Sequence, residues 1–275
     1  MSRVGDCRVL ARGLGRPMAG LALWVALAAS GARLVDIGHN DRGTGAGVRG
    51  LEAWEIETAL TPSVVAMAFS VNATSIVDLP TAIAVCRANG IPLIVDNTTA
   101  TPFLCRPIEL GATLVVHSAT KYLTGNGTVT GGVVVDSGKF DWSKSGKFPS
   151  LSEPEPAYHG LAFHPALGAM AFTFHSIAIG LRDLGMTMNP QGAHYTLMGI
   201  ETLSLRMEKH LANAKAVSEW LEADPRVEFV TYAGLKTSPW NDRVAKVCPK
   251  GAGALFTVGV KGGYDSCVKL VNMAN

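Results

Sequence analysis

The run Val115-Val116-His117-Ser118-Ala119-Thr120-Lys121-Tyr122 decides how the rest of this 275-residue sequence is interpreted. It continues an apolar segment of strand length that opens at Thr113, and it ends in two hydroxyl residues and a lysine. An earlier apolar segment, Pro92-Leu93-Ile94-Val95, leads directly into Asp96-Asn97-Thr98. Both segments have the length and the continuous apolar character of strands that are buried in a parallel sheet.

Residues 64–96 predict one strand–helix–strand unit. Val64 to Val71 is an apolar run of strand length. Asp78 has the position of a helix N-cap, and Asn89-Gly90 are suited to end that helix. A crossover of this kind joins two parallel strands. We therefore expect an α/β fold with a mostly parallel sheet covered by helices.

Polar side chains follow three of the predicted strands: Asn72, Asp96, and the group Ser118, Thr120 and Lys121. The carboxyl ends of parallel strands meet at one edge of a sheet, where ligands of α/β proteins bind. A lysine amine can form a Schiff base with the aldehyde of pyridoxal 5'-phosphate, and a carboxylate can pair with its ring nitrogen. The two hydroxyls can donate hydrogen bonds to the phosphate. These residues together predict a pyridoxal-phosphate site.

Each of these residues also has an ordinary structural explanation. Lys121 would then be a surface lysine at a strand end, and Asn72 a plain turn residue. Asp96, Ser118 and Thr120 would be cap or turn residues. We favour the cofactor site because one residue rarely identifies a site, whereas a lysine, a carboxylate and two hydroxyls at one sheet edge match a single chemistry.

The composition is that of an ordinary globular protein, with 48% hydrophobic and 17% charged residues and a net charge of +2. This charge gives no reason to expect a nucleic acid or a membrane surface as partner. The histidines include no pair with metal-ligand spacing and carboxylate support, so no metal site is predicted. Five scattered cysteines without a C-x-x-C pair fit reduced thiols in a cytoplasmic protein.

The first 32 residues have two interpretations. Four arginines between Arg3 and Arg16 precede an apolar stretch, Met18 to Ala29, which ends in small residues. This is the outline of a secretory signal, and the alternative is an amphipathic or buried helix of the main domain. We favour the helix and a cytoplasmic location, because pyridoxal-phosphate chemistry and unpaired cysteines point inside the cell.

The second half of the sequence predicts a change of organisation. Residues 137–170 are rich in Pro, Ser, Gly and aromatic residues, which indicates an ordered excursion from the sheet. A long helix with one apolar stripe is expected from Gly199 to the stop at Asp224-Pro225. Two short strands follow. We predict a large cofactor-binding domain over residues 1–200 and the start of a smaller, incomplete C-terminal α/β domain over 201–275.

Several motifs resemble those of the Cys/Met-metabolism family of pyridoxal-phosphate enzymes, which have fold type I. The strongest are Val95-Asp96-Asn97-Thr98 and Ser118-Ala119-Thr120-Lys121-Tyr122. The run Gly131-Gly132-Val133-Val134-Val135-Asp136 and the segment from Gly199 to Met207 add to the resemblance. The run Glu153-Pro154-Glu155-Pro156-Ala157-Tyr158-His159-Gly160 makes the chain most similar to the O-acetylhomoserine sulfhydrylase branch.

The resemblance implies a transferase of methionine biosynthesis that replaces the acetoxy group of O-acetyl-L-homoserine with sulfide or methanethiol. Lys121 would be the Schiff-base lysine and Asp96 the partner of the pyridine nitrogen. Ser118 and Thr120 would bind the phosphate, and Asn72 would lie near the cofactor's phenolic oxygen. A homo-oligomer, a dimer of dimers in full-length relatives, is expected. The alternatives are a cystathionine γ-synthase or lyase type of carbon–sulfur enzyme, and a catalytically inactive truncated remnant.

The departures from the family pattern lead us to expect a chain that is truncated at both ends. The sequence has no tyrosine before Tyr122, whereas the family places a ring-stacking tyrosine well before the Asn72 position. The family's arginine for the substrate carboxylate would lie beyond Asn275.

Overall fold

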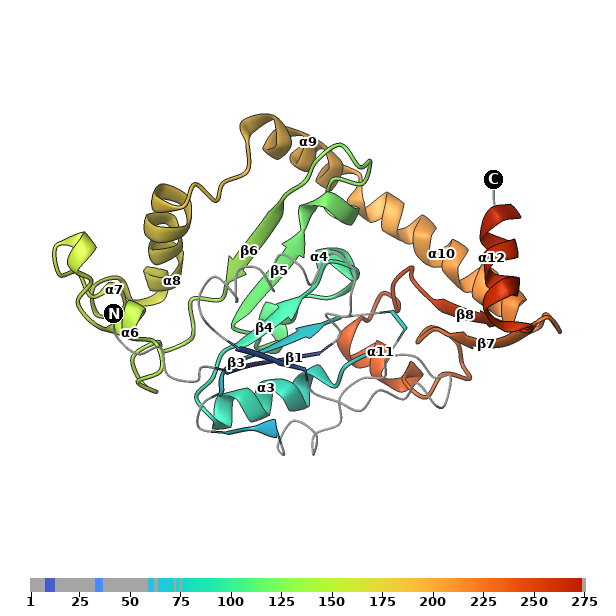
Figure 1. Ribbon diagram of the computed structural model, residues 1–275, viewed down its shortest axis with the longest axis horizontal. Helices are drawn as coiled ribbons and strands as arrows, with labels where there is room; N and C mark the ends of the chain where they lie inside the picture. Colours follow the sequence, from blue (N-terminus) through green and yellow to red (C-terminus); the bar gives the residue numbers. More distant parts are fainter. Residues whose placement is uncertain are drawn as a thin grey trace.

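The computed structural model describes residues 8–12, 33–36, 59–61, 64–71, 73–74 and 76–273. Within these residues the largest unit is a six-stranded sheet with the order β2-β1-β3-β4-β5-β6. In chain order its strands are β1 Arg8–Arg12, β2 Arg33–Asp36, β3 Val64–Ser70, β4 Leu93–Asp96, β5 Leu114–Ser118 and β6 Gly132–Asp136. All neighbouring pairs are parallel except β5 and β6, which are antiparallel. The prediction of a mostly parallel sheet with helices is confirmed (Figure 1).

The N-terminal segment contributes strands at the two places where it is described. Arg8–Arg12 pair with β2 on one side and with β3 on the other. The interpretation of the first 32 residues as a helix is therefore wrong for residues 8–12, because they join the sheet as a strand. Met18 to Ala29 lie outside the described residues.

The predicted strand–helix–strand unit is confirmed. Helix α3, Leu79–Ala88, connects β3 with β4, which pair in parallel. The Asp78 carboxylate accepts a hydrogen bond from Thr81 N at 3.3 Å, which caps the first turn. The apolar face of α3 buries Leu79, Ala82, Ile83 and Cys86 against the sheet. The helix lies along one face of the sheet (Figure 1).

Short helical segments connect the next strands. The stretch from Thr101, predicted as a helix or an irregular turn, forms two four-residue helices, α4 Thr101–Leu104 and α5 Pro107–Leu110. Gly111 ends the second with a φ of +114°, a conformation that glycine adopts without steric cost. After β5, Ala119–Leu123 form a π-helical turn that leads toward β6.

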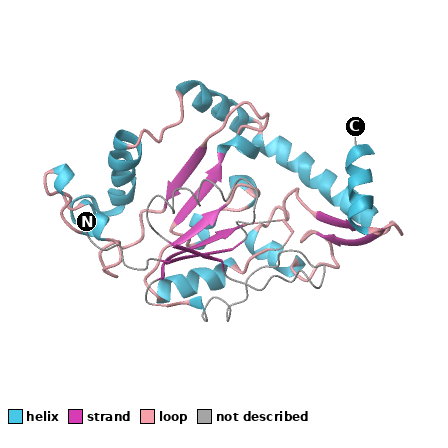
Figure 2. Ribbon diagram, viewed as in Figure 1, coloured by secondary structure: helices cyan, strands magenta, loops and turns pink. Residues whose placement is uncertain are grey.

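The excursion predicted for residues 137–170 is ordered by its own small core. It contains α6 Pro149–Ser152 and α7 Phe163–Leu167, and α8 Ala171–His175 follows. The buried residues of this small core are Trp142, Leu151, Phe163 and Ala171, together with Leu114 of β5. Trp142 stacks on Phe172 with ring centroids 5.3 Å apart. This group of helices lies to one side of the sheet (Figure 2).

The C-terminal part consists of helices around a two-stranded sheet. Its elements are α9 Pro190–Glu201, α10 Leu203–Glu222, β7 Val227–Thr231, α11 Asn241–Val247, β8 Thr257–Val260 and α12 Gly263–Met273. The prediction of one helix from Gly199 is wrong, since α9 ends at Glu201 and α10 begins at Leu203. Thr202 separates them with φ −100° and ψ 4°. Strands β7 and β8 are antiparallel.

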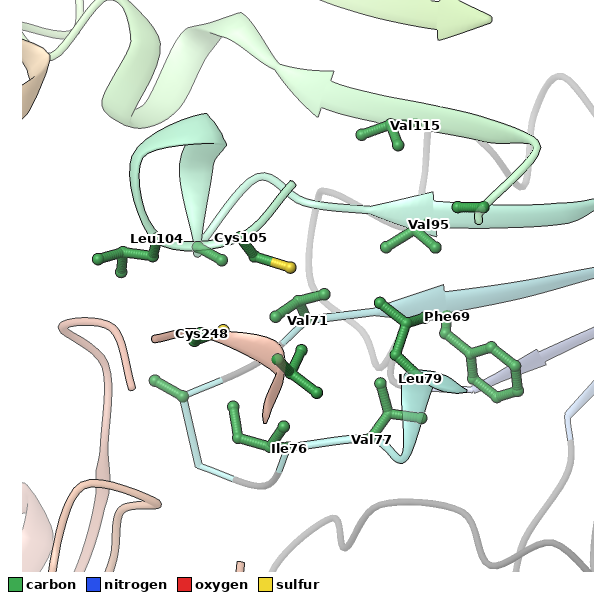
Figure 3. Close-up of a cluster of buried hydrophobic side chains, with 14 of the residues drawn as sticks. Phe69, Val71, Ile76, Val77, Leu79, Val95, Leu104, Cys105, Val115 and Cys248 are labelled. Atoms are coloured by element: carbon green, nitrogen blue, oxygen red, sulfur yellow. The ribbon is translucent and has the colours of Figure 1, made fainter. Parts of the chain in front are cut away.

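The main hydrophobic core includes residues of the large sheet and of the C-terminal part. Cys248, after α11, lies close to Val71, Ile76 and Cys105 in Figure 3 and is buried with them. A hydrogen bond also joins the two parts, since Ala233 N, in the C-terminal part, donates to Ala73 O, after β3, at 2.8 Å. The apolar stripe of α10 enters this core through Leu203, Met207 and Ala214.

Candidate functional site

The strand register places the predicted site residues at one edge of the sheet. Asp96, the last residue of β4, pairs with Ser70 of β3 and with Val116 of β5. Ser118 ends β5, two residues beyond Val116, and Lys121 lies in the turn that follows. Because the three strands are parallel, their carboxyl ends meet where an α/β ligand site is expected. Asn72 lies outside the described residues.

Asp96 is a buried carboxylate at this edge, with 7% of the residue exposed. Its Oδ1 accepts a hydrogen bond from Thr98 N at 2.9 Å. No described residue donates a hydrogen bond to Oδ2. One oxygen therefore fixes the side chain, while the other remains available to a protonated nitrogen.

The loop after Asp96 is tied to both neighbouring strand ends. Thr98 Oγ1 accepts a hydrogen bond from Ser118 N at 2.8 Å. Asn97 N donates to Val116 O at 3.0 Å, and the Asn97 Nδ2 donates to Cys105 O at 2.9 Å. The position of Asp96 relative to Ser118 is consequently set by hydrogen bonds between the two strand ends. Thr98 was not among the predicted site residues, although it is the last residue of the Val95-Asp96-Asn97-Thr98 motif.

The two predicted phosphate ligands differ in their surroundings. Thr120 Oγ1 accepts a hydrogen bond from Gly131 N at 3.0 Å and lies 3.4 Å from Gly131 O. It thereby holds the start of β6 beside the turn. The Ser118 hydroxyl makes no hydrogen bond with a described residue. Ser118 can donate to a phosphate as it stands, whereas Thr120 would first exchange its contact with the Gly131 carbonyl.

Lys121 is exposed and lies in the π-helical turn. Its backbone leaves the helical region with φ −93° and ψ −124°. Its amine makes no hydrogen bond or ion pair with a described residue. The structure therefore leaves the lysine amine free to react at the sheet edge.

Two buried polar atoms beside Asp96 have no hydrogen-bond partner among the described residues: Asn97 Oδ1 and His117 Nδ1. Burial lowers the pKa of His117 below its ordinary value of 6.5, and the nearby Asp96 charge opposes this only in part. His117 is accordingly a neutral, buried ring next to the site. Burial also raises the pKa of Tyr122, the residue after Lys121.

These residues fit pyridoxal phosphate. A free amine can bind the aldehyde, a buried carboxylate can hold a proton on the pyridine nitrogen, and a free hydroxyl at the end of β5 can donate to the phosphate. The unpartnered polar atoms of Asn97 and His117 show that this edge carries hydrogen-bonding capacity beyond what the fold uses. Among the described residues, no group of three His, Cys, Asp or Glu side chains could hold a metal ion.

Arg206, on α10, is a second residue that contacts the site but received no role from the sequence. Its Nη1 donates a hydrogen bond to Tyr122 O at 2.9 Å. The arginine lies within the motif from Gly199 to Met207, which pointed to the family but did not show where the side chain lies. The contact joins residues that are 84 positions apart in the sequence.

Comparisons with known proteins agree with this chemistry. The chain is 47% identical over 190 residues to a homocysteine synthase of Schizosaccharomyces pombe, with 68% of this chain and 44% of that protein covered. It is 44% identical over 222 residues to an O-acetyl-L-homoserine sulfhydrylase of Corynebacterium glutamicum, with 78% and 50% covered. The chain therefore spans about half the length of these curated relatives.

A solved structure has a similar fold. It is a putative O-acetylhomoserine (thiol)-lyase from Campylobacter jejuni with N'-pyridoxyl-lysine-5'-monophosphate, and it is 27% identical to this chain with a TM-score of 0.80. The match covers 94% of this chain and 62% of that one. In the part of the chain that the structure describes, none of the helices has the length and apolar character to cross a membrane. The profile of the Cys/Met metabolism PLP-dependent enzymes matches residues 51–275, and the chain belongs to that family.

Proposed function

We propose that this chain carries the cofactor site of an enzyme that replaces the acetoxy group of O-acetyl-L-homoserine with sulfide or methanethiol. The products would be homocysteine or methionine, together with acetate. The observation that carries the proposal is the meeting of Asp96, Ser118 and Lys121 at one sheet edge, where Thr98 links the first two. The names of the relatives support the choice of substrate class.

Each site residue has a proposed task. Lys121 would hold the cofactor through its aldehyde, and its amine, when free, would accept the proton from the substrate Cα. Asp96 keeps a proton on the pyridine nitrogen through its free oxygen. Ser118 donates to the phosphate, joined by Thr120 when its hydroxyl turns from Gly131, and by Asn72 near the phenolic oxygen. Bound pyridoxal phosphate supplies an electron-withdrawing ring that stabilises negative charge at Cα.

We further propose a homo-oligomer in the cytoplasm. Support for self-association comes from exposed apolar side chains on β6 and α9: Val134, Leu197 and Met198 are 57%, 64% and 54% exposed. Apolar surface of this kind is typical of interfaces. Free thiols at Cys86 and Cys267 support a reducing compartment. The boundary between the large and the smaller domain is proposed at residues 200–201, directly before the break at Thr202.

Visible absorption spectra with added pyridoxal phosphate test the cofactor site. The parent chain should develop an absorption band that Lys121→Ala lacks, and borohydride reduction followed by peptide mass spectrometry should place the cofactor on Lys121. Lys139→Ala, which removes another exposed lysine, is the matched control and should behave like the parent. A parent chain without the band, or with the label on other lysines, would contradict the proposed site.

Activity is tested separately in the same preparations. The parent should release acetate from O-acetyl-L-homoserine only when sulfide or methanethiol is present, and Lys121→Ala should not. Thiol release from methionine or cystathionine without acetate formation would instead identify a carbon–sulfur lyase. A labelled parent that acts on none of these substrates would show cofactor binding without turnover.

A further inference from the structure

The turn that carries Lys121 is bound to helix α10 by one guanidinium group. Arg206 Nη1 donates to Tyr122 O at 2.9 Å, directly after the lysine. Its Nη2 donates to Gly199 O at 2.6 Å, at the end of α9. Its Nε donates to Thr202 Oγ1 at 3.1 Å, in the break between the two helices. All three guanidinium nitrogens thus join the turn to the α9–α10 junction.

The chain around this contact leaves room only for the guanidinium. Gly125 has a φ of +80°, and a Cβ at this position would lie 2.5 Å from Arg206 Nη1. A Cβ on Gly199 would lie 2.3 Å from Thr124 O. The Thr124 and Thr196 hydroxyls are 3.1 Å apart and both residues are buried. The turn after Lys121 is therefore closely packed against α9 as well as bound by Arg206.

The hydrogen bonds of Arg206 all go to neutral groups. Its acceptors are two carbonyl oxygens and one hydroxyl, and no described carboxylate forms an ion pair with it. Charged donors form stronger hydrogen bonds than neutral ones, and a planar guanidinium fixes the direction of each bond. Such a group is suited to hold the carbonyl of Tyr122, and with it the adjoining Lys121 backbone, in one place.

We propose that Arg206 is a positioning residue that holds Lys121 for its reaction with the cofactor aldehyde. The inference rests on the proposed function. In this step the unprotonated lysine amine adds to the aldehyde carbon, and loss of one water leaves a C=N bond without any oxidant or reductant. The Lys121 amine makes no hydrogen bond with a described residue, whereas the Lys121 carbonyl accepts one from Gly125 N at 2.8 Å, so the backbone is the part that the fold can fix.

Stopped-flow absorbance with increasing pyridoxal phosphate tests the role. Arg206→Met keeps an unbranched chain but removes every donor, and it should lower the limiting first-order rate about tenfold, because displaced reacting groups lose rate steeply. The cofactor concentration at half that rate should change less than twofold. Arg206→Lys should recover part of the rate. Thr202→Val removes the Nε contact and the 3.3 Å bond from Thr202 Oγ1 to Gly199 O, but it keeps the bond from Arg206 to Tyr122. This variant and Arg106→Met on the exposed surface should stay within twofold of the parent.

The outcomes separate this inference from the proposed function. A parent chain that never forms the adduct contradicts the proposed function, whatever the variants do. A parent that forms it at the same limiting rate as folded Arg206→Met overturns the positioning role. A lower melting temperature with an unchanged limiting rate in the folded fraction also overturns it, because that result describes a structural residue. If Arg206→Met does not fold, Arg206→Lys decides, and a rate equal to that of the parent counts against the proposal.

Discussion

At the residue scale, Asp96 has a structural contact and a proposed chemical task that one substitution can separate. Asn at position 96 keeps an oxygen that can accept from Thr98 N but loses the negative charge. We expect Asp96→Asn to change the free energy of unfolding by less than about 1 kcal/mol, since the hydrogen bond survives. Turnover should fall about a hundredfold, because the pyridine nitrogen loses its charged partner.

Urea denaturation and acetate release measure these two effects in the same preparation. Asp141→Asn is a control for the loss of a carboxylate away from the sheet edge, since Asp141 is exposed. A variant at position 96 with full turnover would exclude Asp96 as the partner of the ring nitrogen. Loss of folding would show instead that the charge itself holds this strand end.

His117 predicts a pH dependence of stability. Its pKa is lowered below 6.5 by burial, and that of the half-buried His175 is lowered for the same reason. Below pH 6.5 the unfolded chain therefore binds more protons at these rings than the folded chain does. The free energy of unfolding should decrease as the pH falls from about 6.5 toward the lowered pKa values.

Urea denaturation at pH 7 and pH 5 measures this decrease for the parent and for His117→Gln. The variant should lose less stability over this interval, because it has one fewer buried ring to protonate. His194→Gln, at an exposed position on α9, should show the parent's full decrease. An identical pH dependence in parent and His117→Gln would disprove the contribution of His117.

At the scale of elements, the junction between α9 and the turn after Lys121 depends on the absence of a side chain at Gly199. Alanine normally stabilises a helix interior by about 1 kcal/mol relative to glycine. Here its Cβ would lie 2.3 Å from Thr124 O and 2.5 Å from Leu123 O. Backbone oxygens cannot move away cheaply, so Gly199→Ala should lower the free energy of unfolding by about 1–3 kcal/mol.

Chemical denaturation measures the change in the free energy of unfolding for Gly199→Ala and for the control Gly180→Ala. A Cβ on Gly180 would meet only the flexible Met186 Cε, at 3.4 Å, so this substitution should be neutral or slightly stabilising. If both variants were stabilised, helix propensity, rather than the contact with the turn, would govern both positions.

At the scale of the whole molecule, the C-terminal part and the large sheet share one hydrophobic core. Cys248 is 0% exposed and lies among Val71, Ile76 and Cys105 (Figure 3). The neighbouring Cys105 thiol and burial both raise the pKa of Cys248, so it acts as a neutral apolar side chain. Cys248→Ala should therefore cost about 1–2 kcal/mol of the free energy of unfolding through the cavity that it leaves.

Hydrogen exchange shows which backbone amides lose protection in Cys248→Ala. Because the core is shared, amides of β3 and β4 should exchange faster in Cys248→Ala, although the substitution lies after α11. Cys267→Ala, at an exposed position on α12, should leave these amides unchanged. Faster exchange confined to α11 and β7 would show that the C-terminal part folds independently of the sheet.

The parallel sheet, the crossover helix and the position of Asp96, Ser118 and Lys121 at strand ends could all be predicted from the sequence. These features follow from local patterns, since apolar runs, a capping residue and a strand-end polar group lie within a few positions of each other. The break at Thr202 was missed because neither a proline nor a glycine stands at Glu201-Thr202-Leu203 to mark it. Strand β1 was missed because four arginines and an apolar stretch resemble a targeting signal or a helix.

The contacts that hold these residues in place became visible only in the folded chain. The bond from Ser118 N to Thr98, the contact of Arg206 with the carbonyl after Lys121, and the burial of Cys248 against Cys105 join positions 20, 84 and 143 residues apart. Hydrogen bonds and packing act over a few ångströms in space, and a single sequence does not state which distant residues come within that range. The residues proposed to react with the cofactor therefore lie in short sequence motifs, whereas the residues that hold them in place come from distant parts of the chain.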